Sequence, residues 1–172
     1  MEFTLRDGQP ADFETLWRID QDCFPPRIAY SRFELASYTR RREAFTIVAE
    51  TQATPPDLQT KSNPQVTIAG FIVAESNRRA KGHVITIDVL PAYRRSGLGS
   101  KLLLAAEQRL RGITCHTVLL ETAVDNSPAI AFYKRHGYHI VQTIPRYYPD
   151  NVNAFLLEKD LTPTEELRNV SK

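Results

Sequence analysis

A strand, a glycine-containing turn and a helix are predicted in direct succession between Val84 and Leu110. The run from Val84 to Leu90 is rich in β-branched residues, which favours a strand. Thr117 to Thr122 is the next predicted strand, and a helical crossover between the two makes them parallel. Beyond the turn, apolar residues recur at helical spacing, at Leu98, Leu102, Leu103, Ala106 and Leu110. We therefore expect an α/β chain in which this helix packs on a sheet.

The turn has the properties of an anion-binding site. Its two glycines let a ligand approach the backbone closely, and a helix that begins here directs unpaired N–H groups and the positive end of its dipole toward an anion. Its two arginines can donate paired hydrogen bonds to phosphate oxygens. The alternative is an ordinary turn with two solvated arginines, and glycine spacing alone does not decide between them. The residues of the turn are Arg94, Arg95, Ser96, Gly97, Leu98, Gly99 and Ser100.

Two nucleotide-binding motifs fit this turn poorly. A dinucleotide-binding fingerprint needs a third glycine where the chain has Leu102, although Glu121 stands roughly where its ribose-binding acid would fall. In a phosphate-binding loop of the GxxxxGK[ST] type, the glycines, the lysine and the serine or threonine have a fixed order and spacing. The residues around Ser100 and Lys101 have neither. Neither motif is predicted.

Shorter signals place the remaining elements. The pair Ser31 and Glu34 has the spacing of a capping box that starts a helix, and Pro10 suits the first turn of an earlier one, with Phe13, Leu16 and Trp17 on its buried face. Gly112 is expected to cap the long helix, and a short helix over Ala129–His136 should have Ser127 as its N-cap and end at Gly137. Strands are expected at Phe3–Arg6, Ala44–Glu50, Val66–Glu75, Ile140–Val141 and Ala154–Leu157, with the last two flanking a loop over Pro145–Asn153.

Composition excludes several classes of protein. The 172 residues are 42% hydrophobic and 24% charged, as in a folded globular domain, and the net charge of +2 gives no general field for nucleic acid. Cys23 and Cys115 lack CxxC spacing and a histidine pair beside them, so neither a disulfide framework nor a metal site is expected. The absence of a leader-like or membrane-spanning run favours the cytoplasm and no membrane association. One domain over residues 1–161 is expected, with a mobile loop at 51–65 and a loosely attached tail at 162–172.

Three residues after the turn can carry chemistry. Glu121 stands at the end of the second parallel strand, where open α/β sheets place ligands, and it could act as a base; the alternative is a solvated carboxylate. Asn126 precedes the short helix, where capping is the default role and a hydrogen bond to a ligand amide is the other. Tyr133 lies within that helix, where a core aromatic is usual, although its phenol is a usable acid.

The two motifs together resemble the GCN5-related N-acetyltransferase (GNAT) family. Its pyrophosphate signature, [QR]-x-x-G-x-[GA], is matched by Arg94, Gly97 and Gly99. Its N-x-x-A-x-x-x-Y-x-x-x-G-F segment is matched from Asn126 to Gly137, with Tyr138 in place of phenylalanine. The resemblance runs from about Phe3 to Leu161 and implies a mixed, mostly antiparallel sheet of about seven strands, with a parallel pair at the acetyl-CoA site and helices on both faces.

Within the family, Glu121 to Asn126 and Tyr147-Tyr148-Pro149 look most like the protein N-terminal acetyltransferases, including the ribosomal-protein alanine branch. That resemblance implies that Glu121 accepts a proton, that Tyr133 protonates the departing thiolate and that Asn126 contacts CoA. It also implies that the backbone of Ile87, Asp88 and Val89 binds pantetheine and the acetyl group. Tyr147 and Tyr148 would hold the first residues of an acceptor peptide.

The implied chemistry needs neither a metal nor a covalent intermediate. An α-amine has a reference pKa of about 7.7 to 8.0, against about 10.4 for lysine. At neutral pH, a much larger fraction of the α-amine is therefore unprotonated and nucleophilic. Acetyl-CoA and a protein or peptide N-terminus are the expected partners of a monomer or homodimer. Two alternatives remain: acetylation of a small amine such as a polyamine or aminoglycoside, and a CoA-binding module without catalysis.

Overall fold

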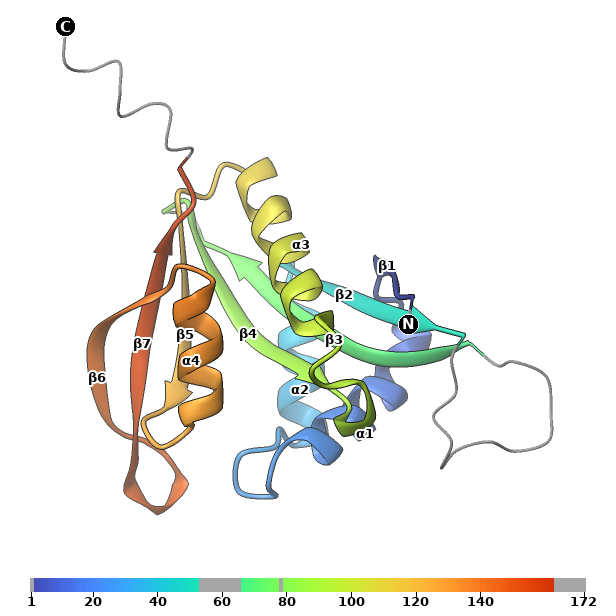
Figure 1. Cartoon of the computed structure of the whole chain (residues 1–172), viewed down its shortest axis with the longest axis horizontal. Coiled ribbons are helices and arrows are strands. Elements are labelled where there is room, and N and C mark those ends of the chain that lie inside the picture. The colour runs from blue at the N-terminus through green and yellow to red at the C-terminus, as the bar shows by residue number, and fades with distance from the viewer. Residues whose placement is uncertain (1, 53–65, 78, 163–172) are drawn as a thin grey trace, which may run out of the picture. The chain divides into compact units, whose positions relative to one another are not determined.

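The computed structural model describes residues 2–52, 66–77 and 79–162 (Figure 1). The loop expected at 51–65 and the tail expected at 162–172 therefore fall almost entirely outside the described residues. Two compact units are present: residues 1–75 with 85–106, and residues 76–84 with 107–172. Two strands and one helix each contribute residues to both units.

Seven strands form one sheet in the order β1-β2-β3-β4-β5-β7-β6. Within the described residues, β4 pairs with β5 in parallel, whereas β1–β2, β2–β3, β5–β7 and β6–β7 are antiparallel. The expected fold class, a mixed and mostly antiparallel sheet, is thereby confirmed. The strands are β1 (Thr4–Asp7), β2 (Ala44–Thr51), β3 (Thr67–Ser76), β4 (Lys81–Val89), β5 (Thr117–Ala123), β6 (His139–Tyr148) and β7 (Val152–Asp160).

The helices begin close to their predicted capping signals. At the start of the second one, the Glu34 N–H donates to Ser31 Oγ at 3.3 Å and the Ser31 N–H donates to the Glu34 carboxylate at 2.9 Å, so the predicted capping box is confirmed. Gly137 has a φ of +88° after the last helix, as a C-terminal glycine should. The α-helices are α1 (Phe13–Cys23), α2 (Arg32–Thr39), α3 (Leu98–Gly112) and α4 (Ser127–Arg135); short 3₁₀ turns are η1 (Pro10–Asp12), η3 (Pro91–Tyr93) and η4 (Pro149–Asn151).

In the first unit, both faces of β2 and β3 are buried. One face packs against α1 and α2 through a cluster whose fully buried members are Leu16, Ile19, Leu35, Val48, Phe71 and Val73. Ile47 and Ile72 alternate with these strand residues, pair with each other in the register and are also buried. Figure 1 shows α1 and α2 behind the strands and the first turns of α3 in front of them. Helices on both faces were expected, and this unit has them.

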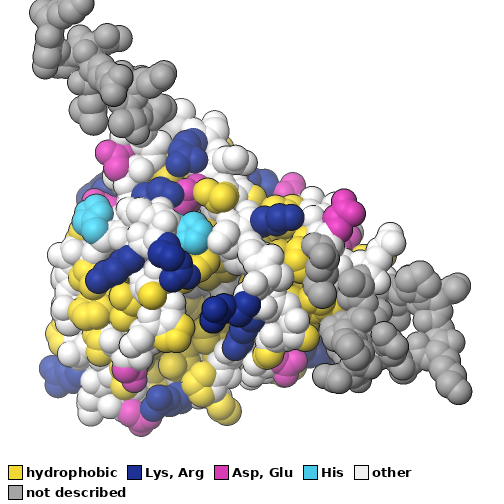
Figure 2. All heavy atoms as spheres, viewed as in Figure 1, with side chains coloured by type: hydrophobic (Ala, Val, Ile, Leu, Met, Phe, Trp, Pro, Cys, Tyr) yellow, Lys and Arg dark blue, Asp and Glu magenta, His cyan; other side chains and the backbone are white. Residues whose placement is uncertain are grey.

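In the second unit, β5, β7 and β6 lie side by side, and Figure 1 shows α4 in front of β5. Val118, Leu120 and Leu157 are buried, and Leu120 pairs with Leu157 in the register. β6 lies at the edge of the sheet and exposes Ile140, Val141 and Tyr147, in a region where Figure 2 shows hydrophobic surface. The interior of this unit is therefore built on β5 and β7, whereas β6 is solvated.

Three local predictions were wrong by small shifts. Asn126, not Ser127, caps α4: its side-chain oxygen accepts from the Ala129 N–H at 3.2 Å. Gly112 is the last residue of α3, and Thr114, with a φ of +65°, supplies the left-handed residue after it. Pro145 lies inside β6 rather than in a loop, because an edge strand with an irregular register tolerates a residue without an N–H.

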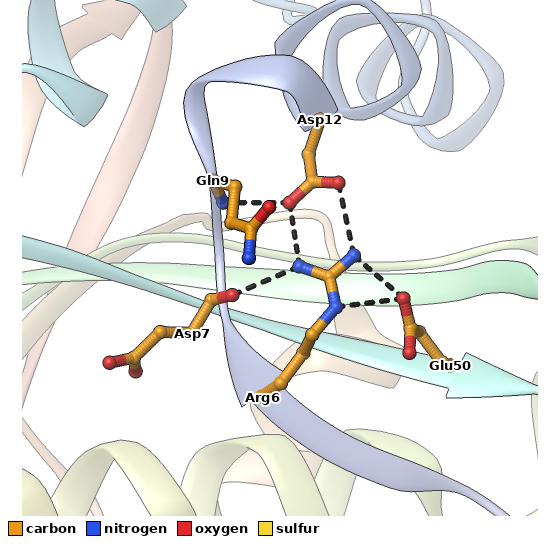
Figure 3. Close-up of polar contacts among 5 residues, drawn as sticks. All are labelled: Arg6, Asp7, Gln9, Asp12 and Glu50. Atoms are coloured by element: carbon orange, nitrogen blue, oxygen red, sulfur yellow. Dashed lines mark hydrogen bonds and ion pairs between the residues drawn. The ribbon is translucent and has the colours of Figure 1, made fainter.

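Arg6 on β1 joins three elements of the first unit (Figure 3). Its guanidinium donates to both carboxylate oxygens of Asp12 at 2.7 and 3.0 Å and to Glu50 on β2 at 2.7 Å. The Gln9 N–H also donates to Asp12, at 2.7 Å. The arginine thus fixes η1 against the β1–β2 pair and lowers the pKa of the Asp12 carboxyl.

Replacing Asp12 should destabilise the fold in a pH-dependent way. We expect Asp12→Asn to lower the free energy of unfolding by about 1–3 kcal/mol at pH 7, because it removes charge-assisted hydrogen bonds. A carboxyl whose folded pKa is depressed stabilises above its unfolded pKa of about 3.9, and the benefit is lost as the pH falls through the folded pKa. Urea unfolding at pH 7 and pH 2.5 measures this difference.

The matched control is Asp22→Asn, the same chemical change at an exposed position of α1. It should leave stability within about 0.5 kcal/mol of the unmodified protein. Equal effects of the two substitutions at pH 7 would contradict the role assigned to Asp12.

Candidate functional site

The turn between β4 and α3 has an unusual backbone and an open surface. Arg95 and Gly97 have φ values of +64° and +83°, in the left-handed region. A Cβ placed on Gly97 would meet no atom within 4 Å, so the space beside this glycine is free. At the start of α3, the Lys101 N–H donates to the Gly97 carbonyl at 3.1 Å. In general, the first N–H groups of an α-helix lie at its end and are available to a ligand. This geometry fits an anion bound at the helix N-terminus.

The side chain of Arg94 bonds to neighbouring backbone carbonyls, and its contact with a phosphate stays a prediction. Its Nε donates to the Val89 carbonyl at 3.0 Å, and its Nη2 donates to the Cys23 carbonyl at 3.4 Å. Ser96 in turn donates its hydroxyl to the Tyr93 carbonyl at 2.6 Å. These bonds hold the turn to the end of β4 and to α1. Arg95, Ser96 and Gly97 are exposed, and Leu98 is buried.

The strand residues predicted to bind pantetheine alternate in burial. Ile87 and Val89 are half-buried, whereas Asp88 between them is completely buried. The Asp88 side chain therefore has no access to a ligand on the surface. Only the backbone groups of this residue could bind a cofactor, which is the role that the resemblance implies.

In the second unit, Glu121 is paired with a histidine. His83 Nε2 lies 2.7 Å from Glu121 Oε2, and the two side chains are 32% and 17% exposed. The parallel register of β4 and β5 explains the pair, since His83 is opposite Leu119 and Glu121 is two residues further on the same face. A carboxylate bonded to an imidazole in a half-buried position can accept and pass on a proton.

The hairpin from β6 to β7 brings two tyrosines into the same unit as this pair. The rings of Tyr147 and Tyr148 meet edge to face, with centroids 4.9 Å apart. Burial raises the pKa of the Tyr148 phenol above its usual range, and the nearby charges of Tyr147 and Glu121 act in the same direction. The Val124 N–H donates to the Asn153 carbonyl at 3.0 Å, so the hairpin is fastened just beyond the end of β5.

Asn126 and Tyr133 both have structural roles, as a helix cap and as a core aromatic residue. Asn126 caps α4, as described above. Tyr133 is 7% exposed, and its ring packs edge to face against Phe132 and Tyr138 at centroid distances of 5.2 and 5.6 Å. Contact of Asn126 with CoA and proton donation by Tyr133 stay predictions.

His83 is the site residue that sequence reasoning missed. It immediately precedes the strand predicted from Val84 to Leu90, but β4 already begins at Lys81. His83, Ile85 and Ile87 stand at every second position, on one face of a strand, and this spacing was a signal for a longer strand. Its partner could not be inferred, because Glu121 is brought beside it only by the strand register.

Surface hollows and clusters of metal-binding residue types are two other features that could mark a site. Two surface hollows of about 240 and 530 Å³ near α1 and α2 are lined by residues such as Phe13 and Arg40, not by predicted site residues. Across residues 2–52, 66–77 and 79–162, no group of three or more His, Cys, Asp or Glu is placed to hold a metal. In that same part of the chain, no helix has the length and apolar content to cross a membrane.

Comparison with known proteins agrees with this geometry. The chain is 29% identical to an N-alpha-acetyltransferase of Sulfurisphaera tokodaii, over 93% of this chain and 94% of that protein. Among solved structures, Ard1 from Thermoplasma volcanium superposes with a TM-score of 0.77 at 26% identity, covering 95% of this chain and all of that one. The ribosomal-protein-S18-alanine N-acetyltransferase from Escherichia coli has the same fold, with a TM-score of 0.77 at 20% identity over 95% and 96% of the two chains.

Residues 13–138 match the acetyltransferase (GNAT) family, which is most of the chain. The two motifs quoted from the sequence both lie inside the matched range. The chain belongs to the GNAT family of N-acetyltransferases.

Proposed function

We propose that this enzyme transfers the acetyl group of acetyl-CoA by direct attack to the N-terminal α-amine of a protein or peptide. The observation that carries the proposal is the pairing of Glu121 with His83 at 2.7 Å, in the same unit as the tyrosine hairpin. The name N-alpha-acetyltransferase of the Sulfurisphaera tokodaii relative supports this choice of acceptor. One acetyltransferase domain over residues 1–161 is part of the proposal.

The turn from Arg94 to Ser100 is the proposed seat of the CoA pyrophosphate. Its fit rests on the left-handed Gly97, the open space beside that glycine and the start of α3 at Leu98. Backbone N–H groups of the turn would donate to the phosphate oxygens, and the exposed Arg95 would add positive charge. The backbone of Ile87 to Val89 would bind the pantetheine and polarise the thioester carbonyl. The bound acetyl-CoA supplies the activated acetyl group.

Glu121 and His83 would remove the proton of the attacking amine. At neutral pH an α-amine is already partly unprotonated, so the base only has to accept the proton released as the new amide bond forms. His83 holds the Glu121 carboxylate in a fixed orientation through their hydrogen bond and can pass the proton toward solvent. Tyr133 is the proposed donor to the departing thiolate, whose pKa resembles the 8.5 of cysteine. Asn126 is proposed to contact CoA in addition to capping α4.

Tyr147 and Tyr148 would bind the first residues of the acceptor peptide. Tyr147 is 48% exposed, and an exposed aromatic ring offers rigid contact area at little cost in side-chain entropy. The left-handed Arg146 and Asp150 fix the shape of the hairpin on both sides of the two tyrosines. We place the enzyme in the cytoplasm, which is supported by its two free cysteines, Cys23 and Cys115.

Removing the base should slow the reaction and leave donor binding intact. We expect Glu121→Gln and His83→Gln each to lower kcat by about 100-fold, because general base catalysis contributes at least that much. Tyr133→Phe should lower kcat as well. The Kd for acetyl-CoA, measured by calorimetry, should stay within about twofold. Glu158→Gln, on the neighbouring strand β7, is the matched control and should keep full activity; unchanged turnover in both Glu121→Gln and Tyr133→Phe would refute the assigned roles.

Filling the open space at Gly97 should abolish donor binding. Gly97→Asp introduces a side chain at a φ of +83° and a negative charge where phosphate is expected, so calorimetry should detect no binding of acetyl-CoA. The control is Gly112→Asp, the same change at an exposed glycine at the end of α3. Normal affinity in Gly97→Asp would show that the turn does not hold the donor.

The acceptor is tested by the release of free CoA from acetyl-CoA. Peptides with a free N-terminus should be turned over, whereas polyamines and aminoglycosides should not. A library varied at the first two positions then reveals the preferred sequence. Turnover of the small amines alone would overturn the proposed acceptor, and tight CoA binding without turnover of any amine would indicate a binding module.

A further inference from the structure

Two aspartates are completely buried in the first unit, Asp20 on α1 and Asp88 on β4. Asp20 Oδ2 accepts from the Tyr30 N–H at 2.8 Å and from the Gln21 amide at 3.0 Å. Asp88 Oδ1 accepts from the Thr86 hydroxyl at 2.7 Å. The other oxygen of each, Asp20 Oδ1 and Asp88 Oδ2, is buried and meets no donor within the described part of the chain. Burying an ionised carboxylate with an unbonded oxygen is costly in free energy. This arrangement therefore favours the protonated form of a carboxyl group.

The surroundings do not neutralise two negative charges. Of the groups described around the two carboxyls, Arg94 is the cation, and its guanidinium already donates to two backbone carbonyls. The thiol of Cys23 on α1 and the carboxylate of Glu34 on α2 are the other titratable groups acting here, and Glu34 disfavours a charge on Asp20. Burial raises the pKa of Asp20 to about 6, and burial together with the charge of Asp20 raises the pKa of Asp88 well above its usual range.

We propose that Asp20 and Asp88 together hold one proton at neutral pH, carried on Asp88 Oδ2, and that the neutral Asp88 is a positioning residue for strand β4. Oδ2 is the atom left for the proton, because Oδ1 already accepts from Thr86. Asp20 then keeps its charge and accepts the hydrogen bonds of Tyr30 and Gln21. The link to acetyl-CoA rests on the proposed function, in which the backbone of Ile87 to Val89 binds the donor.

The positioning role follows from how tightly this part of β4 is tied down. The Tyr30 hydroxyl donates to the Ile85 carbonyl at 3.3 Å, and the Cys23 thiol donates to the Val89 carbonyl at 3.3 Å. On β3, a Cβ added to Gly70 would lie 2.4 Å from the Asp88 carbonyl oxygen, so the two backbones are in close contact. A second negative charge between these contacts would repel Asp20 and loosen α1 and residue 30 from the strand.

The first test is the pH dependence of unfolding. A group whose folded pKa is raised stabilises fully below its unfolded pKa, and that stability is lost as the pH rises toward the folded pKa. Between about pH 6.5 and 8, one extra proton in the folded protein makes the unfolding equilibrium constant rise about tenfold per pH unit. Asp88→Asn should remove this slope, because its amide has the same shape and does not titrate, while Asp22→Asn should keep it. Equal slopes in the unmodified protein and Asp88→Asn would overturn the proposal.

The second test needs no folded variant. The infrared spectrum of the unmodified protein at pH 7.5 should contain the carbonyl band of a protonated carboxylic acid, and Asp88→Asn should lack it if it folds. Absence of the band from the unmodified protein would overturn the proposal.

The positioning role is tested by acetyl-CoA binding without any acceptor. The Kd of the unmodified protein should rise between pH 7 and pH 9 relative to that of Asp88→Asn, and titration of acetyl-CoA itself cancels in this ratio. A constant ratio would refute the positioning role. None of these measurements uses a peptide, so failure of the enzyme to acetylate N-termini would leave the proton assignment standing, and a normal acetylation activity would not rescue it.

Discussion

The backbone reversal between β4 and α3 is the constraint on which the proposed acetyl-CoA site depends. Arg95 and Gly97 both adopt left-handed φ values, and for a residue with a Cβ this conformation costs about 1–3 kcal/mol. The surrounding bonds hold it in place: Arg94 donates to the Val89 carbonyl, and α3 begins immediately with the bond from Lys101 to Gly97. The space beside Gly97 at this reversal is open, so a ligand can approach the backbone where α3 begins.

The pairing of His83 with Glu121, the proposed base, depends on a second constraint, the register of β4 and β5. Side chains alternate between the two faces of a strand, so a slip of one residue would move His83 to the opposite face from Glu121. Strand β4 thus contributes to two proposed tasks along its length, with His83 near its beginning and Ile87 to Val89 at its end. The buried Asp88 accepts from Thr86 within the same strand, and the proposed proton on Asp88 explains how an acidic residue type is tolerated in this buried run.

Much of the fold follows from local signals in the sequence. The strand, turn and helix around Gly97, the capping box at Ser31 and the left-handed Gly137 were all predictable, because each depends on a few neighbouring residues. Small boundary errors arose where two good caps compete, as at Asn126 and Ser127. The family and its fold could be inferred because two separate motifs occur at the right places in one chain.

Long-range pairs could not be predicted in the same way. Glu121 could be selected from its place at a strand end, but its contact with His83 depends on a register that no local pattern encodes. Asp20 could be assigned no role from sequence, since an aspartate in an amphipathic helix is normally solvated. Asp88 gave a better signal, because an acidic residue within a β-branched run is costly unless it is neutral or well bonded.

The central claim is that the acceptor is an α-amine. The most direct measurement uses one peptide that carries both a free N-terminus and an internal lysine, incubated with enzyme and acetyl-CoA at pH 7 and mapped by fragmentation mass spectrometry. We expect a single acetyl group on the N-terminal residue, because that amine has the lower pKa and is the group that the hairpin would present to Glu121. Acetylation of the lysine side chain, with the N-terminus left free, would contradict this claim.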